Sequence, residues 1–259
     1  MTLSSYFIVT EPEKMGYPYL ESISSALGFS DEVVIVAGRP ETDSERKIKN
    51  ISDSIVFHNT DSWPVEWEKK DMEKHLQIAL DLCSGDFALK IDSDHIFRES
   101  SYHGLIRIFK EQSEAHLIRI PRINFYSWVH AGRSCLKHIE YSKTCFAINK
   151  KLSKDSGIDF EIRIQDGSCL PYFNSENIVI YESKDRGLFP INYDNTFMSK
   201  KQISKKWAAW QSMSGVEYRN EAESYLSWES RTKQKSSGWA NCEVGFHPQI
   251  VIDKYIDRL

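Results

Sequence analysis

The sequence of 259 residues lacks the features that mark several classes of protein. Its five cysteines are widely spaced and form no Cys-x-x-Cys pair, so neither a disulfide framework nor a zinc knuckle is indicated. No apolar run approaches the roughly 18 residues of a membrane span, and residues 1–10 carry no basic leader segment. The simplest expectation is a cytoplasmic protein with free thiols.

The sequence also lacks an excess of positive charge and any segment that would divide it into separate domains. A formal net charge of -4 gives no bulk attraction to nucleic acid, so a nucleic-acid partner is not expected. A hydrophobic content of 41% with 27% charged residues is ordinary for a folded protein. Because no repeat, low-complexity tract or Pro/Gly/Ser-rich linker divides the chain, we expect one structural domain overall.

Strand and helix patterns alternate through the first half of the chain. β-Branched and aromatic runs predict strands at residues 6–10, 33–36, 54–57 and 87–91. Helical spacing is clearest over 72–83, where one apolar stripe includes Met72, Leu76, Ala79, Leu80 and Cys83. Such alternation is typical of a parallel, doubly wound α/β sheet with right-handed crossovers.

The second half of the chain is less regular. A helix near 102–112 and a strand at 116–120 continue the pattern, but residues 124–175 are rich in aromatic, glycine and polar residues, with short strands expected at 144–148 and 162–164. Further helices are expected around 203–210 and 217–230. The lysines of the first form a basic face that suits either solvent or an anionic lipid surface: Lys200, Lys201, Lys205 and Lys206.

Two carboxylates, Asp92 and Asp94, follow the fourth predicted strand. Ligands of α/β proteins gather at the carboxyl ends of strands. No Lys or Arg stands next to the pair, so the two charges need a cation close by, and a divalent metal carrying a phosphate meets that need. Asp-x-Asp alone is a weak motif, since two acids in a turn are usually solvated or cap a helix.

The surrounding residues strengthen the motif, because together they resemble the nucleotide-binding half of GT-A glycosyltransferases, in particular family 2-like enzymes. The segments that carry this resemblance are Asp31–Val36, Gly38, Asp43, Trp63, Trp67, residues 72–83 and Gly85–Asp94. It covers residues 1–125, the expected nucleotide-sugar-binding half. Residues 126–259 are then the acceptor-binding half and a C-terminal helical extension.

The resemblance implies a GT-A-type fold with a mainly parallel central sheet, and a hexosyltransferase of polysaccharide biosynthesis. Such an enzyme transfers a sugar from a nucleoside-diphosphate sugar to a hydroxyl of a glycan or lipid-linked acceptor, here with inversion. Mn²⁺ or Mg²⁺ is the implied cofactor, with Asp94 as ligand, Asp92 on the metal or the ribose, and His247 as a candidate third ligand. Peripheral contact with a membrane would suit a lipid-linked acceptor.

Donor contacts are expected from residues near the strand ends and the best predicted helix: Thr10, Glu11, Arg39, Asp43 and Lys74. The family commonly has an Asp directly after the second strand, where this chain has Ala37. Base recognition therefore falls to a neighbour such as Glu11 or Asp43, or to backbone and stacking contacts.

Inversion needs a carboxylate that takes the proton of the attacking hydroxyl. The candidates are Asp159, Glu161 and Asp166, with Asp185 further along the chain. Asp166, followed by Gly167 after a short predicted strand, suits a residue presented into a cleft, although a simple turn Asp explains it equally well.

Three other functions compete with glycosyl transfer. A sugar nucleotidyltransferase shares the general architecture, but it displays a glycine-rich loop with a basic residue after the first strand, unlike Thr10–Glu13 here. A phosphatase-like nucleophilic Asp belongs on the first strand, and this pair follows the fourth. A non-catalytic module that binds a sugar nucleotide or glycan remains open.

Overall fold

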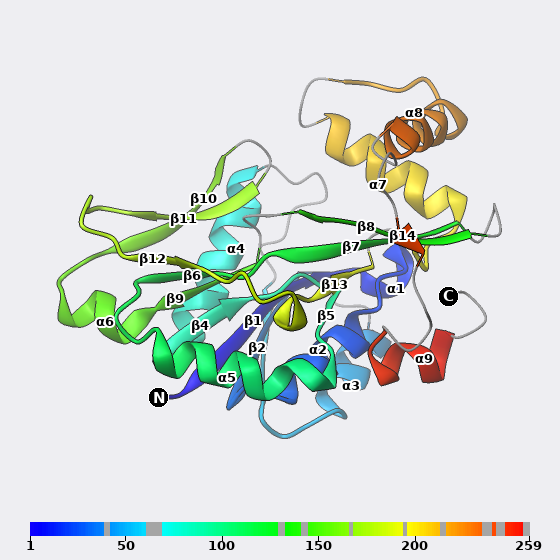
Figure 1. Ribbon diagram of the computed structural model, residues 1–259. Coiled ribbons are helices and arrows are strands. Elements are labelled where there is room, and N and C mark those ends of the chain that lie inside the picture. Colours follow the sequence, from blue (N-terminus) through cyan, green and yellow to red (C-terminus); the bar gives the residue numbers. More distant parts are fainter. Residues whose placement is uncertain are drawn as a thin grey trace.

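The computed structural model describes residues 1–38, 42–60, 69–128, 133–140, 145–165, 168–193, 196–212, 216–234, 240–241 and 247–255. Within these ranges the chain forms two β-sheets with helices packed around them (Figure 1). The larger sheet has seven strands in the order β12-β6-β9-β4-β1-β2-β3. Their bounds are β1 Leu3–Thr10, β2 Glu32–Gly38, β3 Ile55–Thr60, β4 Phe87–Lys90, β6 Leu117–Arg119, β9 Phe146–Asn149 and β12 Ile180–Glu182.

The seven strands of this sheet are parallel apart from β9, which runs antiparallel to both β4 and β6. The four predicted strands of the first half lie side by side as β3-β2-β1-β4, which confirms the predicted doubly wound arrangement. Because β9 and β12 come from the second half of the chain, the sheet draws strands from both predicted halves.

Both faces of the large sheet are covered, and the central strands are accordingly apolar on both sides. On one face, Phe7 and Ile35 pack in one core with α2 (Tyr19–Leu27), α3 (Thr42–Lys49) and α5 (Tyr102–Glu111). On the other, Tyr6 and Val34 pack in a second core with α4 (Lys69–Leu82). Adjacent residues thus enter opposite cores, as the period of two in a strand requires.

A hairpin closes the second core beside α4. Its strands are β10 (Phe160–Gln165) and β11 (Ser168–Phe173). The free edge of β10 pairs with helix side chains, because the N–H of Ile162 donates to Gln77 Oε1 at 3.0 Å and that of Ile164 donates to Glu73 Oε1. The short helix α6 (Lys150–Asp155) precedes the hairpin.

The smaller sheet has five strands in the order β14-β8-β7-β13-β5. Its bounds are β5 His95–Ile96, β7 Arg122–Trp128, β8 Arg133–Glu140, β13 Ile191–Asn192 and β14 Ala240–Asn241. The long β7–β8 hairpin was not predicted. Since β5 starts at His95, the residues between β4 and β5 connect the two sheets.

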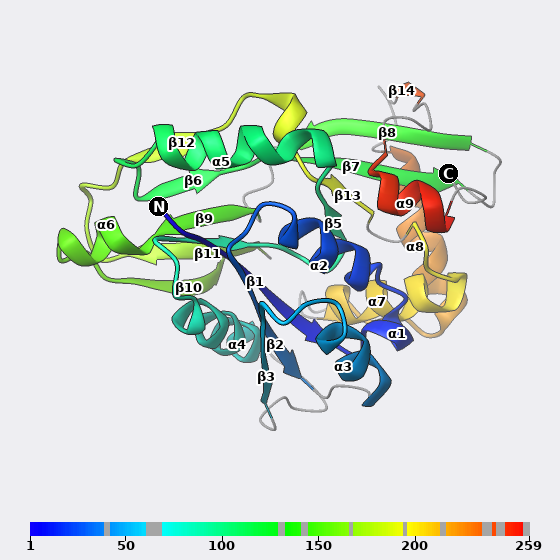
Figure 2. The same cartoon turned by 90° about the horizontal axis from the view of Figure 1, so that it is seen from below.

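The described C-terminal part adds three helices, α7 (Lys200–Ser212), α8 (Glu221–Gln234) and α9 (Gln249–Tyr255). α7 and α8 pack on one another, and α7 lies beside the short helix α1 (Pro12–Met15) in both views (Figures 1 and 2). In α9, Lys254 Nζ lies 2.5 Å from Oε1 of Glu21 on α2. Among the described helices, none is long and apolar enough to cross a membrane.

Candidate metal and donor site

Asp92 and Asp94 lie in the loop after β4, which ends at Lys90, one residue before the predicted end of the strand. The loop is fixed through its backbone. The carbonyl of Asp92 accepts from the N–H of His95 at 2.9 Å, and Ser22 Oγ lies 3.1 Å from it and 2.6 Å from the His95 carbonyl. The N–H of Tyr193 donates to the Asp94 carbonyl at 2.8 Å. The backbone that bears both carboxylates is therefore held in place by hydrogen bonds.

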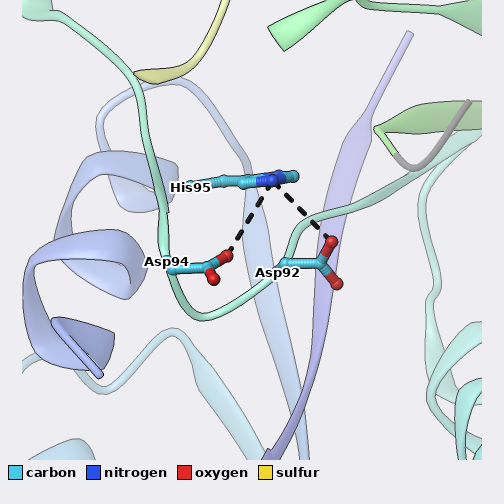
Figure 3. Close-up of side chains that lie close together, drawn as sticks. All are labelled: Asp92, Asp94 and His95. Atoms are coloured by element: carbon cyan, nitrogen blue, oxygen red, sulfur yellow. Dashed lines mark ion pairs between the residues drawn. The ribbon is translucent and has the colours of Figure 1, made fainter. Parts of the chain in front are cut away.

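The two carboxylates converge with the ring of His95 (Figure 3). Each of the three residues offers one ligand atom within 4.8 Å of the others. His95 Nε2 lies 3.8 Å from Asp92 Oδ2 and 3.9 Å from Asp94 Oδ1. The Asp92 side chain is 32% exposed and that of Asp94 is 12% exposed, so the pair is open at one side. Two carboxylate oxygens in this arrangement fit a hard divalent cation that keeps some of its waters.

His95 is fully buried and is held neutral. Arg122 Nη1 lies 3.2 Å from His95 Nε2, and because a guanidinium only donates, that nitrogen must accept. Burial, opposed by the charge of Asp92 and reinforced by Arg122 and Lys90, lowers the pKa of His95 to about 3. The accepting lone pair of Nε2 is thus already used by Arg122, which leaves the two carboxylates as the candidate sources of ligand atoms.

Basic groups adjoin both acids, so the expectation that the pair has no Lys or Arg beside it is wrong. Lys90 Nζ lies 2.5 Å from Asp92 Oδ1, because residues two apart on an extended chain point the same way. Lys206 Nζ, from α7, lies 3.7 Å from Asp94 Oδ2. Burial raises the pKa of Asp92, but the surrounding positive charge, that of Lys90 above all, outweighs burial and lowers the pKa to about 2.

Lys206 also departs from the basic face predicted for its helix. Lys200, Lys201 and Lys205 are exposed as expected, whereas Lys206 is buried. Its ammonium lies 4.6 Å from the centroid of the Tyr17 ring. Lys206 thus lies on the buried side of α7, and three lysines remain on the exposed side.

The carboxyl end of β1 carries two unusual features at predicted donor residues. Thr10 Oγ1 is buried and has no hydrogen-bond partner in the part of the chain that the structure describes. Glu11 has a φ of 41°, in the left-handed region that residues with a side chain seldom adopt. Strain of this kind collects at functional sites. Thr10 pairs in register with Gly38 of β2, so both strand ends meet at the same edge of the sheet.

The other predicted donor residues are not gathered at this point. Arg39, with Trp63 and Trp67, lies outside the described residues. Asp43 stands in the first turn of α3, where its carboxylate pairs with Arg46 at 2.6 Å and with Lys47 at 2.8 Å. Lys74 is exposed on α4. The donor roles of these residues stay predictions.

His247 lies near the acid turn but is not a member of the cluster formed by the described residues. Its Nδ1 is 2.7 Å from the hydroxyl of Tyr193, and its ring meets Phe125 edge-on with centroids 4.6 Å apart. Burial lowers the pKa of His247 to about 4. Since Tyr193 also holds the Asp94 carbonyl, His247 reaches the turn through one intermediate residue. Its role as a metal ligand stays a prediction.

The carboxylates predicted as the general base are scattered. Asp166 lies outside the described residues. Asp159 is partnered by Asn174, whose Nδ2 lies 3.2 Å from Asp159 Oδ2, and Glu161 pairs with Arg163 on β10. Asp185 accepts from the N–H of Gly187 at 2.9 Å, which is an ordinary turn contact. None of these three described acids joins the Asp92–Asp94 cluster.

Comparisons with known proteins give structural matches alone: no family model and no curated protein matches this chain. The crystal structure of S. aureus TarS 1-349 in complex with UDP matches with a TM-score of 0.50 at 15% identity, covering 86% of this chain and 68% of that one. The structure of S. aureus TarS matches with a TM-score of 0.50, but there the chain covers only 42% of TarS. At this identity the likeness shows the fold. The predicted GT-A-type α/β fold is thereby confirmed.

Proposed function

We propose that this chain is a glycosyltransferase that uses a divalent metal and a nucleoside-diphosphate sugar donor. The observation that carries the proposal is the convergence of Asp92 and Asp94 after β4, beside the strained carboxyl end of β1. Support also comes from TarS, which shares the fold and was crystallised with UDP.

The residues present fit the metal that this function needs. Asp92 Oδ2 and Asp94 Oδ1 would hold Mn²⁺ or Mg²⁺, because hard cations take carboxylate oxygens and the diphosphate completes the shell. When bound, the ion supplies Lewis-acid stabilisation of the departing diphosphate. Lys90 keeps Asp92 ionised, Ser22 and Tyr193 hold the loop, and Thr10 with Glu11 would contact the nucleoside.

The acceptor half of the reaction rests on the family resemblance. The acceptor is a hydroxyl of a glycan or lipid-linked molecule, and transfer inverts the anomeric centre. Of the three candidate bases we favour Asp166, since Asp159 and Glu161 are exposed and engaged by Asn174 and Arg163. A cytoplasmic enzyme with a peripheral membrane contact through Lys200, Lys201 and Lys205 is the matching proposal for location.

The test is transfer and hydrolysis of a panel of UDP- and GDP-sugars with Mn²⁺, before and after chelation. Asp94→Asn should lower kcat/KM by roughly a hundredfold or more, because one charged ligand is lost with little change in shape. Asp155→Asn, at an exposed acid on α6, is the matched control. Activity that survives both chelation and Asp94→Asn would refute the metal-dependent mechanism. Metal-dependent UDP or GDP binding without turnover would favour the binding module.

A further inference from the structure

The lysine beside Asp94 is placed by contacts that reach α1 and the two residues just beyond it. Gln202, one turn before Lys206 on α7, donates from Nε2 to the carbonyl of Lys14 in α1 at 2.8 Å. The helix sits so close that a Cβ on Gly16 would lie 2.9 Å from the same nitrogen. Tyr17 is the residue after Gly16, and the centroid of its ring lies 4.6 Å from the Lys206 ammonium. The residues that follow β1 therefore help to position this ammonium.

Lys206 and a divalent cation would interact with the same carboxylate, that of Asp94. The ammonium lies 3.7 Å from Asp94 Oδ2, and the lysine and aspartate side chains are 11% and 12% exposed. Little water separates charges in such a place, so they interact more strongly than on an open surface. Both cations need the negative charge of Asp94, and each repels the other.

We propose that Lys206 competes with the divalent cation for Asp94, and that cation binding releases the ammonium to contact the diphosphate of the donor. The proposal rests on the proposed function for its second step. Tyr17 gives the released ammonium a second support, since an aromatic face attracts a cation. The lysine then couples metal binding to donor binding, because the ion that displaces it also creates the free cation that the diphosphate attracts.

Lys206→Gln tests the competition by changing two affinities in opposite directions. Titration of Mn²⁺ alone, followed by electron paramagnetic resonance, should show roughly tenfold tighter binding than in the wild type, since a nearby positive charge is removed. With Mn²⁺ saturating, calorimetry should show UDP or GDP binding roughly tenfold more weakly, because a cation for the diphosphate is lost. Lys205→Gln, the exposed neighbour on α7, should change neither affinity.

A second measurement uses the wild-type protein and does not depend on how the variant folds. Limited acetylation, read by peptide mass spectrometry, should show the modification rate of Lys206 rising roughly two- to fivefold on addition of Mn²⁺, as its ion pair is lost. Adding UDP or GDP should lower the rate again. Lys205 should keep a constant rate.

These results separate the inference from the proposed function. Mn²⁺ binding to Lys206→Gln that is no tighter than to the wild type, or a Lys206 acetylation rate that Mn²⁺ leaves unchanged, overturns the competition. Nucleotide affinity that is unchanged in Lys206→Gln overturns the second step. Failure of the wild type to bind either UDP or GDP with Mn²⁺ argues against the proposed function, while the competition measured with Mn²⁺ alone still stands.

Discussion

Lys90 and Asp92 form a close pair at the end of the fourth strand, with Lys90 Nζ 2.5 Å from Asp92 Oδ1 and only 4% of the lysine side chain exposed. The lysine is almost wholly removed from water, and the carboxylate beside it offsets the cost of burying its charge. The carboxylate in turn keeps a low pKa because of this lysine. The pair therefore bears on both the stability of the protein and the proposed metal site.

Lys90→Met should destabilise the protein, because it leaves the Asp92 charge in a half-buried place without its partner. We expect a loss of about 2–3 kcal/mol in the free energy of unfolding, below the value for a fully buried pair since Asp92 is 32% exposed. Urea denaturation at neutral pH measures it. Lys110→Met, at an exposed lysine on α5, is the control. The double variant Lys90→Met/Asp92→Asn should recover part of the loss, and no recovery would contradict the pairing.

Ser22→Ala should weaken metal binding through the backbone of the acid turn. Ser22 Oγ is within hydrogen-bond reach of the Asp92 and His95 carbonyls, so its removal costs about 1–2 kcal/mol of stability and loosens the loop. We expect Mn²⁺ affinity to fall roughly three- to tenfold, as when a group that orients a ligand is removed.

Ser25→Ala is the matched control for this change. Ser25 lies one turn further along α2, is equally buried, and bonds the Ser22 carbonyl at 2.8 Å and the N–H of Phe97 at 3.2 Å. It should lower stability to a similar extent without changing Mn²⁺ affinity. Equal losses of affinity in both variants would mean that α2 acts only through global stability.

The fold of the first half followed from the sequence because its signals are local. The residues from Val33 to Val36 form a continuous apolar run, which is typical of a strand buried on both faces. Each of the four is fully buried. The β7–β8 hairpin escaped prediction because its two strands pair with each other across a reversal of the chain. Long-range pairing leaves little trace in a single segment.

The residues of the candidate site also fall into two groups: those that the local sequence predicts and those that only the packing brings together. Asp92 and Asp94 were predictable because they follow a buried strand, and Lys90 could have been added to them, since it is two residues from Asp92. Lys206 could not, because it reaches Asp94 only when α7 packs on α1. Arg122 likewise meets His95 only through the pairing of the smaller sheet.

Cys83 and Cys145 should resist modification in the native protein. Burial raises the pKa of each thiol to about 12, so the reactive thiolate is scarce at neutral pH. Alkylation with iodoacetamide, read by peptide mass spectrometry, should leave both unmodified until denaturant is added. Rapid native labelling of either cysteine would contradict the packing of the two cores, since Cys145 belongs to one and Cys83 to the other.

The free energy of unfolding should fall in mild acid because of His247. Burial lowers its pKa from 6.5 to about 4, so between these values the unfolded chain binds a proton that the native state excludes. The stabilisation is complete above pH 6.5 and is lost as the pH falls toward 4, where the native ring also becomes protonated. One such group contributes a slope of up to about 1.4 kcal/mol per pH unit.

Denaturation by urea at a series of pH values, for the wild type and His247→Phe, isolates this contribution. The variant keeps an aromatic ring against Phe125 but cannot titrate, so its stability should decline less steeply through the same window. Its stability at pH 7.5 should be lower, since the Tyr193 hydroxyl loses its partner. Parallel pH profiles for the two proteins would show that His247 titrates alike in the folded and unfolded chains, and that its burial beside Tyr193 has no electrostatic consequence.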